Sequence, residues 1–292
     1  MSETVELCLD AHANLGEGAL WDEKQQVLYW VDIMGGILHV YNPGSDYNAS
    51  YPVGQPVGTV VLDRQGGVLL AVRDGFARYD LESGQLTLIH DPESHLPDNR
   101  FNDGKCDPGG RFWAGTMAMA THQKGAGSLY RFDPDGSVHS MRSSVTISNG
   151  LVWSTDERIM YYIDTIPHTV TAFDYDKQKG SISNERVVIT VPGQMGAPDG
   201  MAIDVEDKLW IAHYGGGCVR RWDPLTGQVM KTIDLPTSNI TSCAFGGPKL
   251  DTLYITSQGG QDPEKVAREP QAGGLFRVKI GVKGRLSYRF AG

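Results

Sequence analysis

The chain contains the sequence Pro198-Asp199-Gly200-Met201-Ala202-Ile203-Asp204, in which a turn leads into a short apolar run. An apolar run of this length, bounded by turn residues, is typical of a buried strand. Asp199 is therefore expected where a loop becomes a strand. The pattern recurs, because a polar residue and a glycine also precede comparable runs at Glu17-Gly18, Asn102-Asp103-Gly104 and Asn149-Gly150.

Counting five residues back from the polar end of each run gives one column of equivalent positions. Its members are Glu17, Gly58, Asn102, Asn149, Asp199 and Thr241. They recur at intervals of roughly 40–50 residues, which is the spacing of propeller blades. A second β-rich run, a third run and a weaker fourth run follow each column position in phase. Six units of four strands predict one all-β domain over residues 1–292, a six-bladed β-propeller, in preference to two β-sandwich domains.

The strand order of a propeller blade places the column residues on one face of the ring. The loops between second and third strands lie on that face, and so do the loops between blades. Arg100 is expected in one of these blade-to-blade loops, and His213 at the exit of a second strand. Two long loops, residues 116–127 and 257–273, are candidate lids. Ring closure has two candidates, because residues 5–9 or residues 286–290 could supply the outer strand of the last blade.

The composition excludes some classes of partner. The net charge is −9 and no basic stripe is present, which argues against nucleic acid. No apolar run approaches the length of a membrane span, and the N-terminus lacks a secretory signal. No feature implies a protein partner. We therefore expect a cytoplasmic protein with reduced thiols at its four cysteines, which show no CxxC spacing: Cys8, Cys106, Cys218 and Cys243.

Three column residues could form a metal site in the central channel. Glu17, Asn149 and Asp199 begin inner strands of different blades and carry hard oxygen donors, which suit Ca²⁺, Mg²⁺ or Mn²⁺. Three protein ligands would leave open positions, as a catalytic metal needs. Turn chemistry is the simpler explanation for any one of these residues alone. It explains less well why four of the six equivalent positions hold carboxylate or carboxamide oxygens.

Five segments, spread nearly from end to end, form a joint motif: Leu15-Gly16-Glu17-Gly18, Arg100-Phe101-Asn102-Asp103-Gly104-Lys105, Trp113-Ala114-Gly115-Thr116-Met117, Ser148-Asn149-Gly150-Leu151 and Pro198-Asp199-Gly200. In their order and spacing they resemble the SMP-30/gluconolactonase/luciferin-regenerating-enzyme family. The resemblance implies a six-bladed propeller that opens sugar lactones with a divalent metal in the channel. It implies Glu17, Asn149 and Asp199 as metal ligands, Asp199 as the acid/base, and Arg100 and Asn102 as substrate contacts.

The resulting expectation is a metal-dependent lactonase for a small sugar lactone of the gluconolactone, xylonolactone or arabinonolactone type. The ion would polarise the lactone carbonyl while Asp199 moves the proton. Asp103 is a candidate either to orient Arg100 or to contact the substrate, with turn chemistry as the alternative. The family's metal varies, so Ca, Zn, Mn, Mg and Fe all stay open. Some members carry an acidic residue shortly after Gly-Thr-Met, where this chain has Ala118-Met119-Ala120-Thr121-His122, and this leaves the sugar open as well.

Two other functions compete with the lactonase. One is a metal-dependent esterase or phosphotriesterase on the same propeller, which an apolar pocket would favour. The other is a non-catalytic binding propeller with a structural metal, since the fold alone does not decide function. Neither a Gly-x-Ser-x-Gly elbow nor a phosphate-binding GxxxxGK[ST] loop is present. His213 could act as a base, but a polar loop histidine without a role is the simpler interpretation.

Overall fold

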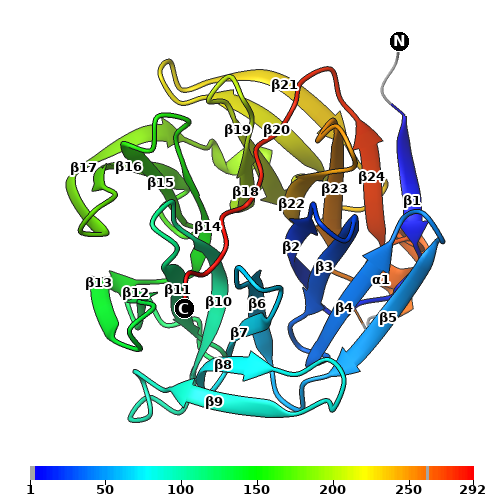
Figure 1. Ribbon diagram of the computed structural model, residues 1–292. Coiled ribbons are helices and arrows are strands. Elements are labelled where there is room, and N and C mark those ends of the chain that lie inside the picture. The colour runs from blue at the N-terminus through cyan, green and yellow to red at the C-terminus, as the bar shows by residue number, and fades with distance from the viewer. Residues whose placement is uncertain (1–3, 261–262) are drawn as a thin grey trace.

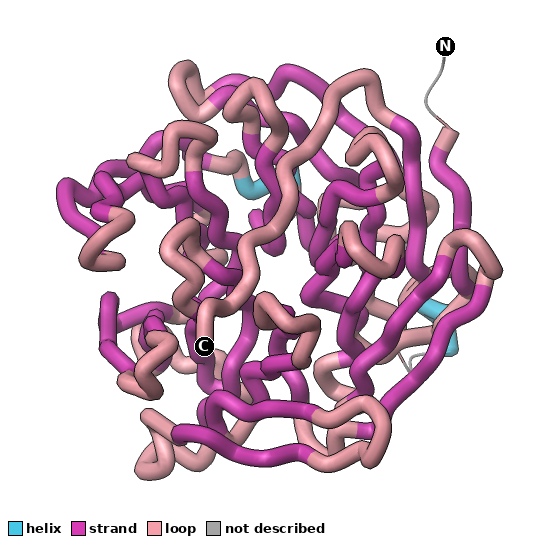
Figure 2. The backbone as a smooth tube through the Cα atoms, viewed as in Figure 1, coloured by secondary structure: helices cyan, strands magenta, loops and turns pink. Residues whose placement is uncertain are grey.

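Short β-branched and aromatic runs, each ended by a turn, assemble into six four-stranded antiparallel sheets arranged as a ring. The computed structural model describes residues 4–260 and 263–292 (Figure 1). In each sheet the strand that contains the column position is the innermost. The prediction of an all-β six-bladed propeller is therefore confirmed, and two β-sandwiches are excluded. Among these described residues, helix is confined to two short segments, α1 (Pro263–Arg268) and a 3₁₀ turn at Gly193–Met195 (Figure 2).

The first three blades follow one another without interruption. Blade 1 holds β2 (Gly16–Asp22), β3 (Val27–Asp32), β4 (Ile37–Asn42) and β5 (Tyr47–Pro52). Blade 2 holds β6 (Val57–Leu62), β7 (Val68–Val72), β8 (Gly75–Tyr79) and β9 (Leu86–His90). Blade 3 holds β10 (Asn99–Cys106), β11 (Phe112–Ala118), β12 (Gly127–Phe132) and β13 (Val138–Val145).

The last three blades repeat the pattern, and the chain terminus completes the sixth. Blade 4 holds β14 (Ser148–Trp153), β15 (Ile159–Asp164), β16 (Thr169–Asp176) and β17 (Ser181–Thr190). Blade 5 holds β18 (Ala197–Ile203), β19 (Leu209–Tyr214), β20 (Cys218–Asp223) and β21 (Gln228–Asp234). Blade 6 holds β22 (Ile240–Gly246), β23 (Thr252–Ser257), β24 (Leu275–Lys279) and, on its outer edge, β1 (Val5–Leu9).

The N-terminal strand closes the ring. Of the two candidates from the sequence, residues 5–9 form the outer strand, with Val5 opposite Val278 and Leu7 opposite Phe276. The other candidate, residues 286–290, adds no strand to this sheet. That segment belongs to a C-terminal tail, residues 281–292, which runs across one end of the channel and is drawn in red in Figure 1.

Apolar packing between neighbouring blades holds the ring together. Six buried clusters each join residues from two adjacent blades. The inner strand β2 is buried along its whole length, whereas the outer strand β5 has no buried residue. All six tryptophans are buried, as expected of core residues, and Trp21 stacks on Tyr254 across the junction of blades 1 and 6 at a centroid distance of 5.5 Å.

The C-terminal tail spans the closed end of the channel and touches every blade. The backbone N–H of Gly284 donates to the Leu250 carbonyl in blade 6, and that of Arg285 donates to Ile203 in blade 5. Further contacts run from Arg285 Nη1 to Ser154 O, Arg289 Nη2 to Asp22 Oδ1, Phe290 N to Leu62 O and Ala291 N to Gly110 O. These contacts leave the opposite end, where the inner strands begin, as the entrance to the channel.

Two of the sequence expectations concern thiols and membranes. Cys106, Cys218 and Cys243 are buried and Cys8 is half-buried, and all four are free thiols, as predicted. Among residues 4–260 and 263–292, no helix has the length and apolar character to cross a membrane.

Candidate active site

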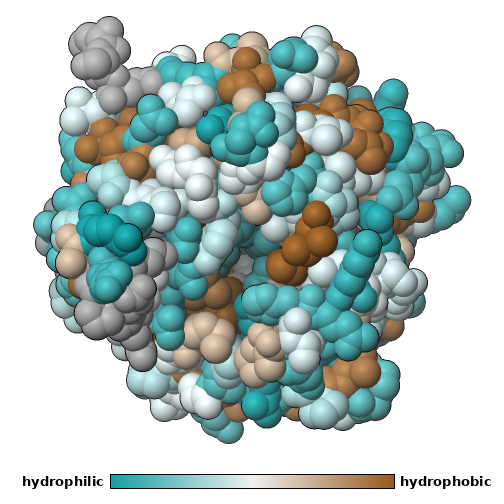
Figure 3. All heavy atoms as spheres, turned by 180° about the vertical axis from the view of Figure 1, so that it is seen from behind, coloured by the Kyte–Doolittle hydropathy of each residue, from teal (hydrophilic) through white to brown (hydrophobic). Residues whose placement is uncertain are grey.

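A break in strand pairing at the start of each inner strand aims the column side chains into the channel. The register with the second strand shifts between Glu17 and Leu20 in β2, between Phe101 and Gly104 in β10, and at the matching places in the other four blades. Such bulges re-aim side chains that would otherwise alternate across the sheet. The face on which these strands begin is shown in Figure 3, with a hollow at its centre.

The predicted site residues converge at this end of the channel. Glu17, Arg100, Asn102, Asp103, Asn149 and Asp199 are all buried, with exposed fractions between 3% and 6%. Gly58, the column member of blade 2, has no room for a side chain, because a Cβ there would lie 2.3 Å from the carbonyl oxygen of Asn102. Arg100 was expected in a loop, but it lies within β10, which begins earlier than the sequence pattern indicated.

The amide side of the site is a hydrogen-bonded chain. Arg100 Nη1 donates to Asn102 Oδ1 at 2.7 Å, and Asn102 Nδ2 donates to Asn149 Oδ1 at 3.0 Å and to Ser148 O at 2.7 Å. Asn149 Nδ2 in turn donates to Thr165 Oγ1 at 2.7 Å. Both N–H bonds of Asn102 are therefore taken by the protein, and only its Oδ1 keeps a lone pair for a substrate hydroxyl.

The acidic side of the site is electrostatically strained. Burial raises the pKa of Glu17 well above its usual range, and the charges of Asp199 and Asp103 raise it further. Burial and the charge of Asp103 likewise raise the pKa of Asp199, although the Gly200 N–H and Arg100 oppose them. Asp199 Oδ1 is buried and has no hydrogen-bond partner. Crowded, desolvated carboxylates of this kind favour either protonation or a bound cation.

Arg100 is the cation that the protein itself places among these carboxylates. Burial lowers the pKa of its guanidinium to about 10, while Glu17 and Asp199 act in the opposite direction. The side chain is anchored through Nη1, which also donates to Phe101 O at 2.9 Å, and its buried Nε has no partner. The guanidinium therefore stays charged at neutral pH and retains donors for a bound anion or hydroxyl.

The donor set of Glu17, Asn149 and Asp199 fits a hard divalent ion. The unpartnered Oδ1 of Asp199 and the repulsion between the carboxylates are the features that a cation would relieve. Within the described ranges, no group of three or more His, Cys, Asp or Glu side chains is placed to hold a metal. The predicted set contains only two residues of those types, with an amide oxygen as the third donor, so the metal site stays a prediction.

His213 is not the polar loop residue that the sequence suggested. It lies in β19, fully buried, with its Nδ1 3.1 Å from Met195 O and its Nε2 accepting from Trp222 Nε1 at 3.2 Å. Because a carbonyl can only accept, the proton sits on Nδ1. Burial lowers the pKa of His213 to about 3, so the ring is neutral and has no free nitrogen to act as a base.

Sequence reasoning gave no role to several polar groups at the entrance. Thr165 accepts from Asn149 directly after β15, and Thr116, predicted as the start of a loop, lies inside β11. At the rim, Tyr214 donates its hydroxyl to Gln258 Oε1, which also accepts from Asn239 Nδ2 at 2.9 Å. Burial and the charge of Asp199 raise the pKa of Tyr214. A sequence signal did exist for three of them, because Tyr214 ends β19, and Thr165 and Gln258 directly follow β15 and β23.

Known proteins are similar to this chain along nearly its whole length. Residues 15–259 match the model of the SMP-30/Gluconolactonase/LRE-like region. The chain is 41% identical over 294 residues to regucalcin of Oryctolagus cuniculus, covering 99% of this chain and 98% of the relative. It is 41% identical over 284 residues to the putative sugar lactone lactonase YvrE of Bacillus subtilis (strain 168), covering 97% of each.

A solved structure has the same fold along almost the whole chain. The crystal structure of a calcium-binding protein, regucalcin, from Agrobacterium tumefaciens superimposes with a TM-score of 0.93 at 29% identity, over 99% of this chain and 97% of that one. With the match across residues 15–259 and relatives above 40% identity along almost the whole chain, the protein belongs to the SMP-30/gluconolactonase/LRE-like family.

Proposed function

We propose that this protein is a divalent-metal-dependent lactonase that hydrolyses aldonolactones, of the gluconolactone, xylonolactone or arabinonolactone type, to the aldonic acids. The observation that carries the proposal is a buried cluster of three carboxyl groups, Glu17, Asp103 and Asp199. Burial and these charges raise the pKa values of Glu17 and Asp199, and the Arg100 guanidinium lies close enough to oppose this shift. Such a cluster is costly to fold without a ligand, so its presence favours a role in binding and chemistry. A relative with 41% identity is named a putative sugar lactone lactonase.

Glu17, Asn149 and Asp199 would hold the divalent ion. When bound, such an ion supplies Lewis-acid polarisation of the lactone carbonyl and stabilises the negative charge that develops on its oxygen. Oxygen donors alone favour Ca²⁺, Mg²⁺ or Mn²⁺ over softer metals, although Zn and Fe stay within the proposal. Calcium has additional support, since the similar Agrobacterium protein is described as calcium-binding.

The polar side chains beside this set would hold the sugar. Arg100 presents a buried charged fork whose Nη1 alone is fully engaged, and Asn102 keeps one lone pair on Oδ1. Asp103 accepts from the Gly104 N–H at 2.7 Å through Oδ1, which leaves Oδ2 for a substrate hydroxyl. Hydroxyl-rich substrates would satisfy these groups, whereas an apolar ester would leave them buried and unpaired. This favours the lactonase over the esterase alternative.

Asp199 would move the proton during hydrolysis. Water would add to the lactone carbonyl carbon to form the tetrahedral intermediate, and in this step it would give a proton to the Asp199 carboxylate. As the intermediate collapses, the bond from the carbonyl carbon to the ring oxygen breaks, and Asp199 returns the proton to that oxygen. Asp199 must be ionised to accept this proton, and a cation bound beside it would favour that form.

Lactone hydrolysis by metal-stripped protein would test the proposal. Ca²⁺, Mg²⁺, Mn²⁺, Zn²⁺ and Fe²⁺ would be added back singly across a panel of aldonolactones, with proton release followed against spontaneous ring opening. Metal-restored turnover of at least one lactone is the expected result. A folded protein that binds an ion but opens none of the lactones would contradict the proposal, and simple esters would then be the next substrates.

A further inference from the structure

A one-way hydrogen-bond relay links three blades at the mouth of the channel. It runs from Arg100 in β10 through Asn102 to Asn149 in β14, then to Thr165, and ends on the carbonyl oxygen of Pro198 in β18, with donor–acceptor distances of 2.7 to 3.0 Å. Every side chain in the relay is at least nine-tenths buried. The relay ends on the residue that directly precedes Asp199.

The direction of the relay is fixed because the group at each end can act only as a hydrogen-bond donor or only as an acceptor. At one end Arg100 can only donate, so Asn102 must present its oxygen to it. The Ser148 carbonyl can only accept, so Asn102 Nδ2 must face that way. At the other end the Pro198 carbonyl takes the single hydroxyl proton of Thr165 at 2.8 Å. Thr165 Oγ1 can therefore only accept from Asn149.

The orientation of the Asn149 amide follows from these constraints. Its Nδ2 donates to Thr165 at 2.7 Å, so its Oδ1 faces Asn102 and keeps one lone pair. A flipped amide would set its N–H₂ against the N–H₂ of Asn102 and would point donors at an incoming cation. From this geometry we infer that Thr165 is a positioning residue for the ion site, which holds Asn149 in the orientation that binds a cation. The inference rests on the metal dependence proposed above.

The backbone around Thr165 makes it a firm anchor. Asp164 accepts from the backbone N–H groups of Thr146 and Ile147 through its two oxygens, both at 3.0 Å. The Thr165 N–H donates to Ile147 O at 3.1 Å. These bonds tie the end of β15 to the segment that leads into β14, so the hydroxyl of Thr165 and the amide of Asn149 cannot drift apart. Outer partners of this kind orient metal ligands and tune their affinity.

Calorimetric titration of metal-stripped protein with Ca²⁺ and with Mn²⁺ tests the inference. Thr165→Val removes the acceptor at nearly constant volume and should weaken binding by about 10–100-fold, the range for partners behind the ligands. Thr165→Ser keeps the hydroxyl and should bind with nearly wild-type affinity. Thr171→Val, a buried threonine in β16 of the same blade, is the matched control and should leave affinity unchanged. Thr165→Ala replaces Thr165→Val if the latter does not fold.

A double-mutant cycle separates positioning of the amide from general loosening of the site. In an Asn149→Asp background the two side-chain oxygens are equivalent, so there is no amide to orient. Thr165→Val should then cost no affinity, whereas it costs affinity beside Asn149. An equal loss in both backgrounds, or wild-type affinity in Thr165→Val alone, overturns the inference while the proposed function stands. A wild-type protein that binds neither ion overturns both.

Discussion

Polar residues stand at both ends of the inner strands, but their side chains have different numbers of hydrogen-bond partners at the two ends. At the closed end, each of the first five inner strands ends at or directly before a polar residue. In chain order these residues are Asp22, Asp63, Asp107, Ser154 and Asp204. Asp204 accepts from the N–H groups of Glu206 and Lys208, from Trp210 Nε1 and from Arg221. At the entrance, by contrast, Asp199 has a buried Oδ1 without a hydrogen-bond partner.

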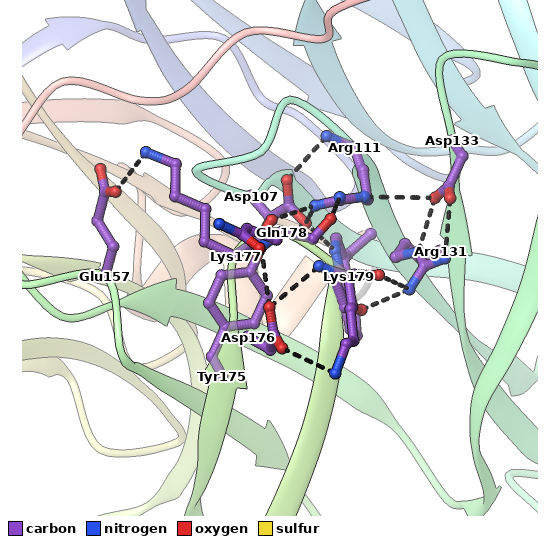
Figure 4. A network of polar contacts seen from close by, with 12 residues as sticks. Asp107, Arg111, Arg131, Asp133, Glu157, Tyr175, Asp176, Lys177, Gln178 and Lys179 are labelled. Carbon is purple, nitrogen blue, oxygen red and sulfur yellow. Dashed lines mark hydrogen bonds and ion pairs between the residues drawn. The ribbon is translucent and has the colours of Figure 1, made fainter.

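Asp107 is a closed-end carboxylate with several buried hydrogen-bond donors. It accepts from Trp113 Nε1 at 2.9 Å, from the Tyr175 hydroxyl at 2.6 Å and from Arg111 Nη1 at 3.3 Å. The same Nη1 also donates to the Lys177 carbonyl, and Arg111 Nη2 donates to the Gln178 carbonyl (Figure 4). Asp22 is a partial exception, because its Oδ2 has no partner although Arg289 binds its Oδ1 at 2.6 Å. A carboxylate with its partners built in stabilises the fold, while one without them is free to bind a ligand.

Replacing Asp199 with Asn should produce the largest functional effect. The substitution removes both the proposed proton acceptor and one ion ligand, so kcat should fall by at least about 10²–10⁴-fold, the range for general acid–base catalysis alone. Because the carboxylate is strained in the metal-free protein, the free energy of unfolding without metal should rise or stay unchanged. Lactone turnover and urea unfolding measure the two quantities. Wild-type turnover by Asp199→Asn would remove Asp199 from the mechanism.

Replacing Asp204 with Ala should show the opposite profile. It leaves Arg221 and Trp210 Nε1 without their buried partner and should destabilise the fold by about 3–5 kcal/mol, as when one member of a buried pair is removed. Turnover per folded molecule should be unchanged. Asp80→Ala, at an exposed turn, is the control and should change stability little. A loss of activity in folded Asp204→Ala would break the proposed division between the two ends.

The pH dependence of stability should report the strain of the entrance carboxylates. The raised pKa values of Glu17 and Asp199 mean that the native metal-free protein binds more protons than the unfolded chain above about pH 4, so these groups lower stability as pH rises. His213, whose pKa is lowered to about 3, has the opposite slope below about pH 6.5. The His213 contribution is the same in wild type and in Asp199→Asn, so it cancels when the free energies of unfolding of the two proteins are subtracted at each pH. Unfolding without metal should show a difference that grows as pH rises above about 4, and identical pH profiles would contradict the predicted strain.

Loosening the tail should have the smallest effect. Arg285→Ala removes the hydrogen bonds to Ser154 O at 3.0 Å and to the Tyr288 hydroxyl at 3.1 Å, and the stacking of its guanidinium over Tyr288. We expect a loss of about 1–2 kcal/mol in the free energy of unfolding, since each such bond contributes about 1 kcal/mol net. Affinity for the ion and kcat should not change, since the tail lies at the far end of the channel. A changed kcat would show that the two ends are coupled.

The in-phase repeats were sufficient to predict the blades and the convergence of Glu17, Asn149 and Asp199, because a ring brings equivalent strand ends together. Ring closure was not predictable, since residues 5–9 and 286–290 have similar patterns and only pairing with β24 decides between them. The placement of Arg100 in a strand depends on a bulge that has no simple sequence signal. The relay through Thr165 depends on contacts between blades, which local patterns do not contain.

The central claim is that the entrance column binds a cation and the closed-end column does not. Calorimetric titration of Ca²⁺ and Mn²⁺ into metal-stripped wild type, Asp199→Asn and Asp63→Asn tests it most directly, because Asp63 is a closed-end carboxylate bound by the N–H groups of Gln65 and Gly67. The account predicts one ion per chain for wild type and Asp63→Asn, and no measurable binding to Asp199→Asn. Equal binding to all three proteins, or none to wild type, would contradict it.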